Sequence, residues 1–260
     1  MNLLIGNTSQ LSYYFPESYL RISSRNIDFD FIKKSNINSV HILFAEQRTF
    51  LNKDEDFFYE VNVDYTIKLI DTIKDYVKKI VVYSTSELWN NYDGTVFVGD
   101  NFNYNYTPYI KSKEILSNII NENKSKYQNV NIIYPFNFNS PYRKPGFLFS
   151  KIFDSLINRT INKIGDINFT RDLVHPSVIV RESINTNEDK LIGTGELINI
   201  EAYVFDLFNL HNLNYKDYLV SEKDNNLKNI RKNYFSGKSY SNYNELLTLT
   251  NKDTYEYKIG

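Results

Sequence analysis

The chain has 260 residues, with 30 lysines and arginines against 31 aspartates and glutamates, so its formal net charge is −1. This balance argues against a nucleic acid partner bound on a broad basic face, because neutralising phosphates takes many clustered cations. The absence of cysteine excludes disulfides, thiolate metal sites and a cysteine nucleophile, and the three histidines are too widely spaced to indicate a metal site.

The beginning of the chain shows no targeting signal. It lacks a basic stretch followed by an apolar one, and no window approaches the run of about 18 apolar residues that a membrane span needs. These features predict a cytoplasmic protein with no membrane partner.

The first half of the chain alternates short β-branched segments with longer helical patterns, which is typical of parallel βαβ units. Between the third and fourth strands, apolar residues recur at steps of three and four from Phe58 to Val77, which predicts one buried helical face. The predicted strands are residues 2–5, 19–23, 40–44, 80–84 and 130–134.

Another helix is expected to begin at Thr107 and Pro108, because threonine is a favourable N-cap and proline suits the first helical position. It is expected to run to about residue 123, with Ile110, Ile115 and Ile119 on its apolar face.

The alternation loosens after about Pro141. Residues 147–157 and 201–210 have helical patterns, a Gly-Thr-Gly turn occupies 193–195, and the polar tail from Ser221 is expected to wrap the surface. We predict an α/β fold, with a Rossmann-like doubly wound parallel sheet in a dinucleotide-binding domain and a small, mostly helical C-terminal substrate lobe interleaved with it. The expected domains are residues 1–140 and 141–260.

The strongest candidates for chemistry are Tyr109 and Lys113 on the predicted helix. Residues four apart share a helical face, so the ammonium would lower the phenol pKa from about 10 and make it a proton donor or acceptor near neutrality. Ser86 follows a strand whose carboxyl end would face a ligand crevice, so it is a candidate to bind the same substrate oxygen. The other pair of this spacing, Tyr234 and Lys238, spans a helix-breaking Phe-Ser-Gly. The alternative is that these groups only end a strand and cover a surface.

The turn after the first strand is a degenerate dinucleotide-binding turn. Such a turn needs glycines where the backbone approaches pyrophosphate, yet only Gly6 is present, and Ser9 and Ser12 stand where later glycines would fall. By itself this turn favours a plain strand–helix connection, and the closeness of the next strand predicts a short first helix. The candidate cofactor contacts here are Gly6, Thr8, Ser9, Gln10 and Leu11.

The second strand ends at Ser24 and Arg25 without a carboxylate. A carboxylate there would bind the 2′-hydroxyl of NAD, whereas an arginine with hydroxyl neighbours suits the 2′-phosphate of NADP. This favours NADP over NAD, with an ordinary solvated arginine as the alternative.

Taken in order, these segments resemble the extended short-chain dehydrogenase/reductase family, in its NAD-dependent epimerase/dehydratase branch. The resemblance covers most of the chain to about residue 200, and the Gln-Leu pair of the first turn is similar to that of nucleotide-sugar 4-keto-reductases. The segments that carry it are 6–12 (the glycine turn), 60–66 (a helix), 84–89 (the Ser/Thr strand end), 109–113 (Tyr-x₃-Lys), 135–141 (similar to Arg-Pro-x-Asn-x-x-Gly-Pro) and 171–175 (similar to Arg-Asp-Phe-x-His).

The resemblance implies that Tyr109 is the acid/base, that Lys113 holds the nicotinamide ribose, and that Ser86 binds the reacting carbonyl or hydroxyl. It also implies a cofactor contact at Ala45, although the charged residues that follow replace the family's small ones. Trp89 comes soon after Ser86 and is a candidate to stack on a base or sugar. The resemblance places Asn137, Arg143 and Arg171 near the sugar or diphosphate, while His41 and His175 are expected to be structural.

The implied function is an NAD(P)-dependent reductase of a keto nucleotide sugar in surface polysaccharide biosynthesis. One alternative is an epimerase of the same family. Another is a non-catalytic nucleotide-sugar-binding or scaffold protein, which the degenerate turn and the charged segment 46–48 favour. The expected partners are a nucleotide-sugar substrate and NADP or NAD, and the resemblance allows a homodimer.

Overall fold

The structure is a computed structural model that describes residues 1–51, 53–221 and 232–259. The chain divides into two compact units. The first consists of Met1–Asn90, Val98–Pro135 and Val180–Leu191, and the second of Asn91–Phe97, Phe136–Ile179 and Ile192–Gly260.

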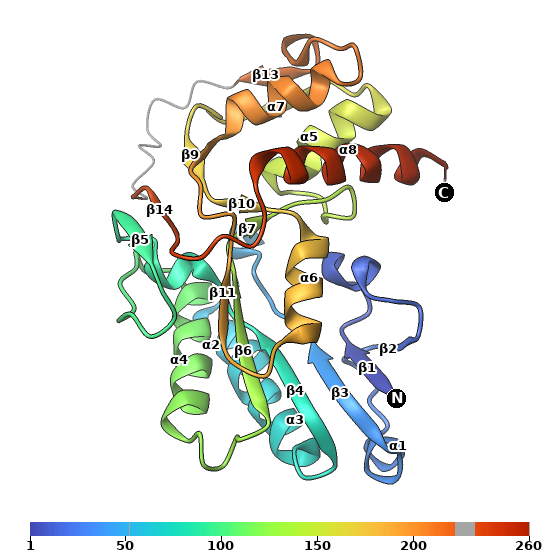
Figure 1. The fold of residues 1–260 in the computed structure, drawn as a ribbon, viewed down its shortest axis with the longest axis vertical. Coiled ribbons are helices and arrows are strands. Elements are labelled where there is room, and N and C mark those ends of the chain that lie inside the picture. Colours follow the sequence, from blue (N-terminus) through green and yellow to red (C-terminus); the bar gives the residue numbers. More distant parts are fainter. Residues whose placement is uncertain (52, 222–231, 260) are drawn as a thin grey trace. The chain divides into compact units, whose positions relative to one another are not determined.

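A six-stranded sheet forms the centre of the first unit, in the order β11-β6-β4-β3-β1-β2 (Figure 1). The pairs β1–β2, β1–β3, β3–β4 and β4–β6 are all parallel. Helices cover the sheet, so its central strands are buried runs of valine and isoleucine. The predicted Rossmann-like doubly wound parallel sheet is confirmed. Its strands are β1 (Asn2–Ile5), β2 (Tyr19–Ile22), β3 (Ile37–Ile42), β4 (Val77–Tyr83), β6 (Val130–Pro135) and β11 (Lys190–Ile192).

The strand order differs from the most common dinucleotide-binding order. That order reads 3-2-1-4-5-6, whereas the described strands here read 2-1-3-4-5-6 when numbered along the chain. β2 is therefore the edge strand, and only the short helix α1 (Phe29–Lys34) lies between it and β3. The topological switch point of this sheet lies between β1 and β3.

A helix with a π-helical turn connects β3 to β4. It consists of α2 (Glu55–Tyr59), η3 (Glu60–Asp64) and α3 (Tyr65–Ile73), which follow one another without a break. The predicted helix is thus confirmed, although Val77 belongs to β4. A π turn holds one extra residue and re-aims the side chains around it. Here Asn62 bonds to the chain after β3, and Tyr65 bonds to the chain after β2.

The predicted helix at Thr107 is α4 (Pro108–Glu122), and the Thr107 side chain accepts the N–H of Ile110 as an N-cap. Its buried face differs from the predicted one, because Ile115 and Ile119 are only half-buried. The helix is rotated so that polar side chains face inward. The buried residues are Ile110, Ser112, Lys113, Leu116, Ser117 and Ile120.

His41 lies in the core, as expected, and starts a buried hydrogen-bonded chain. Its Nδ1 is 3.0 Å from the hydroxyl of Tyr83, which donates to the hydroxyl of Ser183 at 2.7 Å. Ser183 in turn donates to the carbonyl of Val180. Burial, together with the charge of Lys79, lowers the pKa of His41 to about 3, so its ring is neutral. This series of hydrogen bonds fixes the second half of α6 (Pro176–Asn185) against β4.

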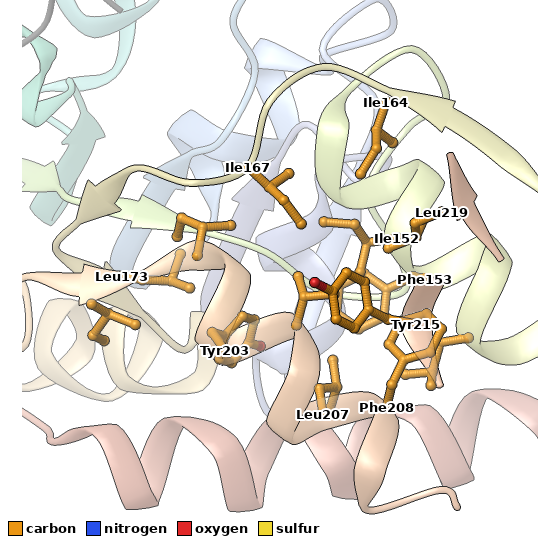
Figure 2. Close-up of a cluster of buried hydrophobic side chains, with 14 of the residues drawn as sticks. Ile152, Phe153, Ile164, Ile167, Leu173, Tyr203, Leu207, Phe208, Tyr215 and Leu219 are labelled. Carbon is orange, nitrogen blue, oxygen red and sulfur yellow. The ribbon is translucent and has the colours of Figure 1, made fainter. Parts of the chain in front are cut away.

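The second unit has a core formed by three helices and several short strand pairs. Its apolar side chains meet between α5 (Leu148–Asn158), α7 (Ile200–Asn209) and α8 (Tyr243–Ile259), as Figure 2 shows for Phe153, Tyr203 and Phe208. α5 and α7 confirm the two helices predicted for this region. The strand pairs are β5 (Gly94–Val96) with β14 (Tyr234–Ser236), β7 (Asn137–Phe138) with β10 (Leu173–Val174), β8 (Asn162–Ile164) with β13 (Leu219–Ser221), and β9 (Thr170–Arg171) with β12 (Ile198–Asn199).

The expectation of a tail wrapped over the surface is wrong for the part that the structure describes. Residues 222–231 lie outside the described residues, but Tyr234 is buried in β14 and Leu246 is buried on α8. The tail contributes a strand and a long helix to the second unit.

Candidate active site

The parallel strands of the first unit bring several predicted site residues to one edge of the sheet. Because β1 to β4 all run in the same direction, the residues after their carboxyl ends lie along that edge. These residues are Gly6, Ser23 to Arg25, Phe44 to Glu46, and Ser84 to Ser86.

Ser86 lies where β4 passes into the short helix η4 (Ser86–Trp89). Thr85 caps η4 by accepting the N–H of Glu87, and Ser86 is buried. The neighbouring Ser84 hydroxyl is 3.0 Å from the hydroxyl of Ser117 on α4. The strand end is therefore linked directly to the helix that carries Tyr109.

Tyr109 and Lys113 lie one turn apart on α4, as the spacing predicts. The ammonium of Lys113 is buried and donates to the carbonyl oxygen of Tyr83 at 2.7 Å, its one hydrogen-bond partner among the described residues. An ammonium has three N–H donors, so it can bind two more acceptors such as ribose hydroxyls. Burial lowers the pKa of Lys113 to about 8.

The lowered pKa predicts an alkaline limit on any activity that needs the Lys113 charge. The ammonium is present below about pH 8 and is lost above it, so we expect kcat/KM to fall as the pH rises through this value. A pH profile measures this. Lys126→Gln, which removes an exposed lysine that pairs with Asp71, should leave the fall in kcat/KM at alkaline pH unchanged. Activity that persists unchanged to pH 10 would contradict the role of the ammonium.

The segment that leads into α4 is tied to η4. The Oδ1 of Asn90 accepts the N–H of Asn105 at 2.7 Å, and its Nδ2 donates to the carboxylate of Glu87 at 3.1 Å. The N–H of Asn103 donates to the carbonyl of Leu88. These bonds hold the turn that carries Ser86 in register with the start of the helix that carries Tyr109.

Trp89 is a core residue. Only 1% of it is exposed, and its indole N–H donates to the carbonyl of Asp100. Its ring packs edge-on against Phe102 and Tyr134, with centroid distances of 5.2 and 5.3 Å. This packing does not support the expected stacking of Trp89 on a substrate.

In the segment after β3, the charges of Glu46 and Arg48 neutralise each other. Glu46 forms an ion pair of 2.6 Å with Arg48, and hydrogen bonds from Arg48 outweigh the effect of burial and hold the pKa of Glu46 below its usual value. The side chain of Asn62 bonds both the N–H and the carbonyl of Glu46 and donates to Ser112 on α4. The chain at Ala45 is thereby anchored to both helices.

The turn after β1 is tight, and the first helix is short, as expected. Gly6 has a φ of +106°, and a Cβ there would lie 2.7 Å from the backbone nitrogen of Phe44. The following helix, η1 (Gln10–Tyr14), is a five-residue 3₁₀ helix. Of the predicted cofactor contacts, Gln10 and Leu11 are buried, Ser9 is half-buried and Thr8 is exposed.

At the end of β2, Arg25 is exposed and its backbone N–H donates to the hydroxyl of Ser23. The carbonyl of Ser24 accepts the hydroxyl of Tyr65. The contact between Ser24 and Tyr65 was not predictable from the sequence, because it depends on the π turn before Tyr65.

The remaining predicted substrate contacts belong to the second unit. Asn137 is half-buried in β7, and the guanidinium of Arg143 lies 3.9 Å from the centroid of the Phe147 ring. Arg171 is buried, lies over the ring of Phe169 and donates to the carbonyl of Thr170. His175 bonds Ser177 and Asp253, which agrees with the structural role expected for it.

Asp172 is a buried acid with no role predicted from the sequence. Its Oδ1 accepts the N–H and the hydroxyl of Thr194, both at 2.7 Å, and its Oδ2 accepts the N–H groups of Gly195 and Ser236 at 3.1 and 3.0 Å. Burial raises its pKa, although these bonds oppose the shift. A Cβ on Gly193 would lie 2.3 Å from Oδ2. We call this arrangement of Asp172, residues 193–195 and Ser236 the Asp172 cradle.

The described residues contain neither a cluster of metal ligands nor a membrane-spanning helix. No group of histidine, aspartate and glutamate side chains among them is arranged to hold a metal ion. None of the described helices has both the length and the apolar character needed to cross a membrane.

Residues 47–245 match the family model of GDP-mannose 4,6 dehydratase. The chain belongs to the GDP-mannose 4,6-dehydratase family. This membership confirms the resemblance to the NAD-dependent epimerase/dehydratase branch of the extended short-chain dehydrogenase/reductases, and with it an enzyme family. The matched residues begin after Gly6, Arg25 and Ala45. The family match therefore covers Ser86, Tyr109 and Lys113 but not the degenerate turn. Comparison with curated protein sequences gives no significant match.

Solved structures of similar fold cover nearly the whole chain. A UDP-N-acetylglucosamine 4-epimerase from Methanobrevibacter ruminantium M1, in complex with UDP-N-acetylmuramic acid, has a TM-score of 0.77 at 15% identity, over 98% of each chain. RMD from Pseudomonas aeruginosa, complexed with NADPH, has a TM-score of 0.76 at 12% identity, over 98% of this chain and 99% of that one. DesIV, a dTDP-glucose 4,6-dehydratase from Streptomyces venezuelae with NAD and TYD bound, has a TM-score of 0.75 at 17% identity, over 98% and 97%.

Proposed function

We propose that this protein is an NAD(P)-dependent enzyme that reduces a keto nucleotide sugar in surface polysaccharide biosynthesis. The observation that carries the proposal is the placement of Tyr109 and Lys113 one turn apart on α4, with the ammonium bonded to the end of the strand that leads to Ser86. Family membership supports it, as do the neighbours of similar fold that bind NADPH, NAD and a UDP-sugar.

In this proposal the chain's own groups control the charge on one substrate oxygen. Ser86 and Tyr109 bind that oxygen, and Tyr109 passes a proton to it. The positive charge of Lys113 favours the phenolate, and its remaining donors hold ribose hydroxyls. A bound nicotinamide would supply the hydride.

The remaining site assignments in the proposal concern the ends of the two ligands. The exposed guanidinium of Arg25 is suited to a 2′-phosphate, so NADP is the preferred cofactor. Arg143 and Arg171 would neutralise diphosphate charge, and Asn137 would contact the sugar.

Dehydration is a second candidate, favoured by the family match and by the position of Glu87. Removing water requires one group that takes a proton from carbon and one that protonates the leaving hydroxyl. Glu87 follows Ser86 at the carboxyl end of β4 and is half-buried, with its carboxylate bonded to Asn90. Glu87→Gln is expected to abolish dehydration of a nucleotide hexose and to spare reduction of a keto sugar.

The test is turnover by the purified chain with NADPH and a panel of 4-keto nucleotide sugars. We expect the absorbance of the reduced nicotinamide to fall with at least one of them. No loss with any substrate, under conditions where calorimetry shows the sugar to be bound, would contradict the reductase and favour the binding protein. Formation of a keto sugar from a nucleotide hexose would instead identify the dehydratase.

A further inference from the structure

One side chain joins the segments that follow β2 and β3, the two strands that flank β1. Tyr65 begins α3, and its hydroxyl donates to the carbonyl of Ser24, just after β2. Its ring packs against Phe44, just after β3, with centroids 5.3 Å apart. β2 and β3 flank β1 in the sheet, so Tyr65 spans the place where an open α/β sheet binds its ligand.

The π turn sets the direction of Tyr65. The N–H of Tyr65 donates to the carbonyl of Glu60, five residues earlier, which is the bond that defines a π turn. In the same turn, Asn62 holds the backbone of Glu46. Both side chains therefore hold the chain that follows β3, and Tyr65 is fixed by its helix and not by a flexible loop.

Three further features on this side of the sheet differ from a dinucleotide-binding site: the turn after β1, the helix after it and the edge of the sheet. A Cβ on Gly6 would lie 2.7 Å from the backbone nitrogen of Phe44, so the turn after β1 passes close to the segment after β3. The 3₁₀ helix η1 ends where the guanidinium of Arg21 bonds the carbonyls of Ser12 and Phe15, so it is too short to provide the field that a full helix offers to phosphate. The described sheet also has no strand beyond β2, where the common dinucleotide-binding order has its third strand.

A dinucleotide site has a nicotinamide side and an adenosine side, and only the adenosine side is affected by these contacts. The nicotinamide side keeps Lys113 with spare donors, whereas on the adenosine side Tyr65 has to move aside before a nucleotide can reach Arg25. We propose that Tyr65 closes the adenosine half of the crevice, so that the protein holds its cofactor by the nicotinamide half and binds adenosine diphosphates weakly. The choice of ligand rests on the proposed function.

The proposal is tested by calorimetry with the full chain, using ADP-ribose for one half of the cofactor and nicotinamide mononucleotide for the other. If Tyr65 moves aside in about a tenth of the molecules, Tyr65→Ala should bind ADP-ribose about tenfold more tightly than the unaltered chain. Tyr65→Phe, which loses only the bond to Ser24, should show a smaller gain. The control Tyr76→Ala removes an exposed tyrosine from the turn after α3 and should change neither affinity. Affinity for nicotinamide mononucleotide should stay constant throughout.

An unchanged or weaker affinity of Tyr65→Ala for ADP-ribose would overturn the proposal and would make Tyr65 and Phe44 a stacking surface for the base. Tyr65→Phe keeps the ring and the packing against Phe44, so it supplies the answer if the alanine variant fails to fold. Tighter ADP-ribose binding without turnover of any keto sugar would support the closure and contradict the proposed function. Turnover of a keto sugar, together with an unchanged affinity of Tyr65→Ala for ADP-ribose, would support the proposed function and contradict the closure.

Discussion

Replacing Tyr109 with phenylalanine is expected to lower kcat for keto-sugar reduction by about 10²- to 10⁴-fold, the usual contribution of a positioned acid or base. The substitution removes the phenol proton and keeps the ring. Lys113 lies one turn away, and its ammonium is held by the carbonyl of Tyr83, so the groups that would bind the ribose stay in place. Turnover should therefore collapse while affinity for nicotinamide mononucleotide changes little.

Tyr106→Phe is the matched control. Tyr106 lies three residues before Tyr109 in the same segment, is 57% exposed, and bonds Glu55 outside the proposed site. Its substitution should leave kcat within a few-fold of the parent. If Tyr109→Phe keeps activity comparable to this control, Tyr109 does not move the proton.

The central elements of the site were predictable because their signals are local. The strand leading to Ser86 is a short run of β-branched residues, and a threonine cap followed by proline predicts the start of α4 at the right residue. With the helix start fixed, a spacing of four places Tyr109 and Lys113 on one face.

The adenosine side was not predictable in the same way. The sequence shows the missing glycines after Gly6, but the bridge by Tyr65 depends on one extra residue in a π turn, which the pattern of apolar residues does not reveal. The contact also joins segments 41 residues apart. The apolar residues keep their steps of three and four across such a turn, so the pattern predicts a regular helix.

Helix α8 was missed because its buried face is largely polar. Thr250 accepts the hydroxyl of Tyr203, Asp253 bonds His175, and the hydroxyl of Thr254 lies 3.0 Å from His211. Periodicity analysis looks for apolar residues at these positions, so a helix held by satisfied polar groups reads as a polar tail. The same cause displaced the predicted face of α4, where Lys113 and Ser117 point inward.

Gly193→Ala is expected to give the largest loss of stability. A Cβ at this position would lie 2.3 Å from Oδ2 of Asp172, 2.8 Å from its Cγ and 2.8 Å from the ring of Phe136. The carboxylate cannot move away without releasing the N–H groups of Gly195 and Ser236, which are bonded to the same oxygen. Overpacking costs about 1–3 kcal/mol, and each buried N–H left without a partner costs about 1–3 kcal/mol more. We therefore expect the free energy of unfolding to fall by about 3–9 kcal/mol, measured by urea denaturation.

Gly165→Ala provides the comparison, because a Cβ there meets no atom within 4 Å. It should leave the free energy of unfolding unchanged or raise it by up to about 1 kcal/mol, since alanine restricts the unfolded chain more than glycine does. Equal denaturation midpoints for the two variants would mean that the Asp172 cradle yields without losing its hydrogen bonds. A loss confined to Gly193→Ala would instead show that the cradle is a rigid part of the second unit, in which one carboxylate joins the turn at 193–195 to the strand that begins at Tyr234.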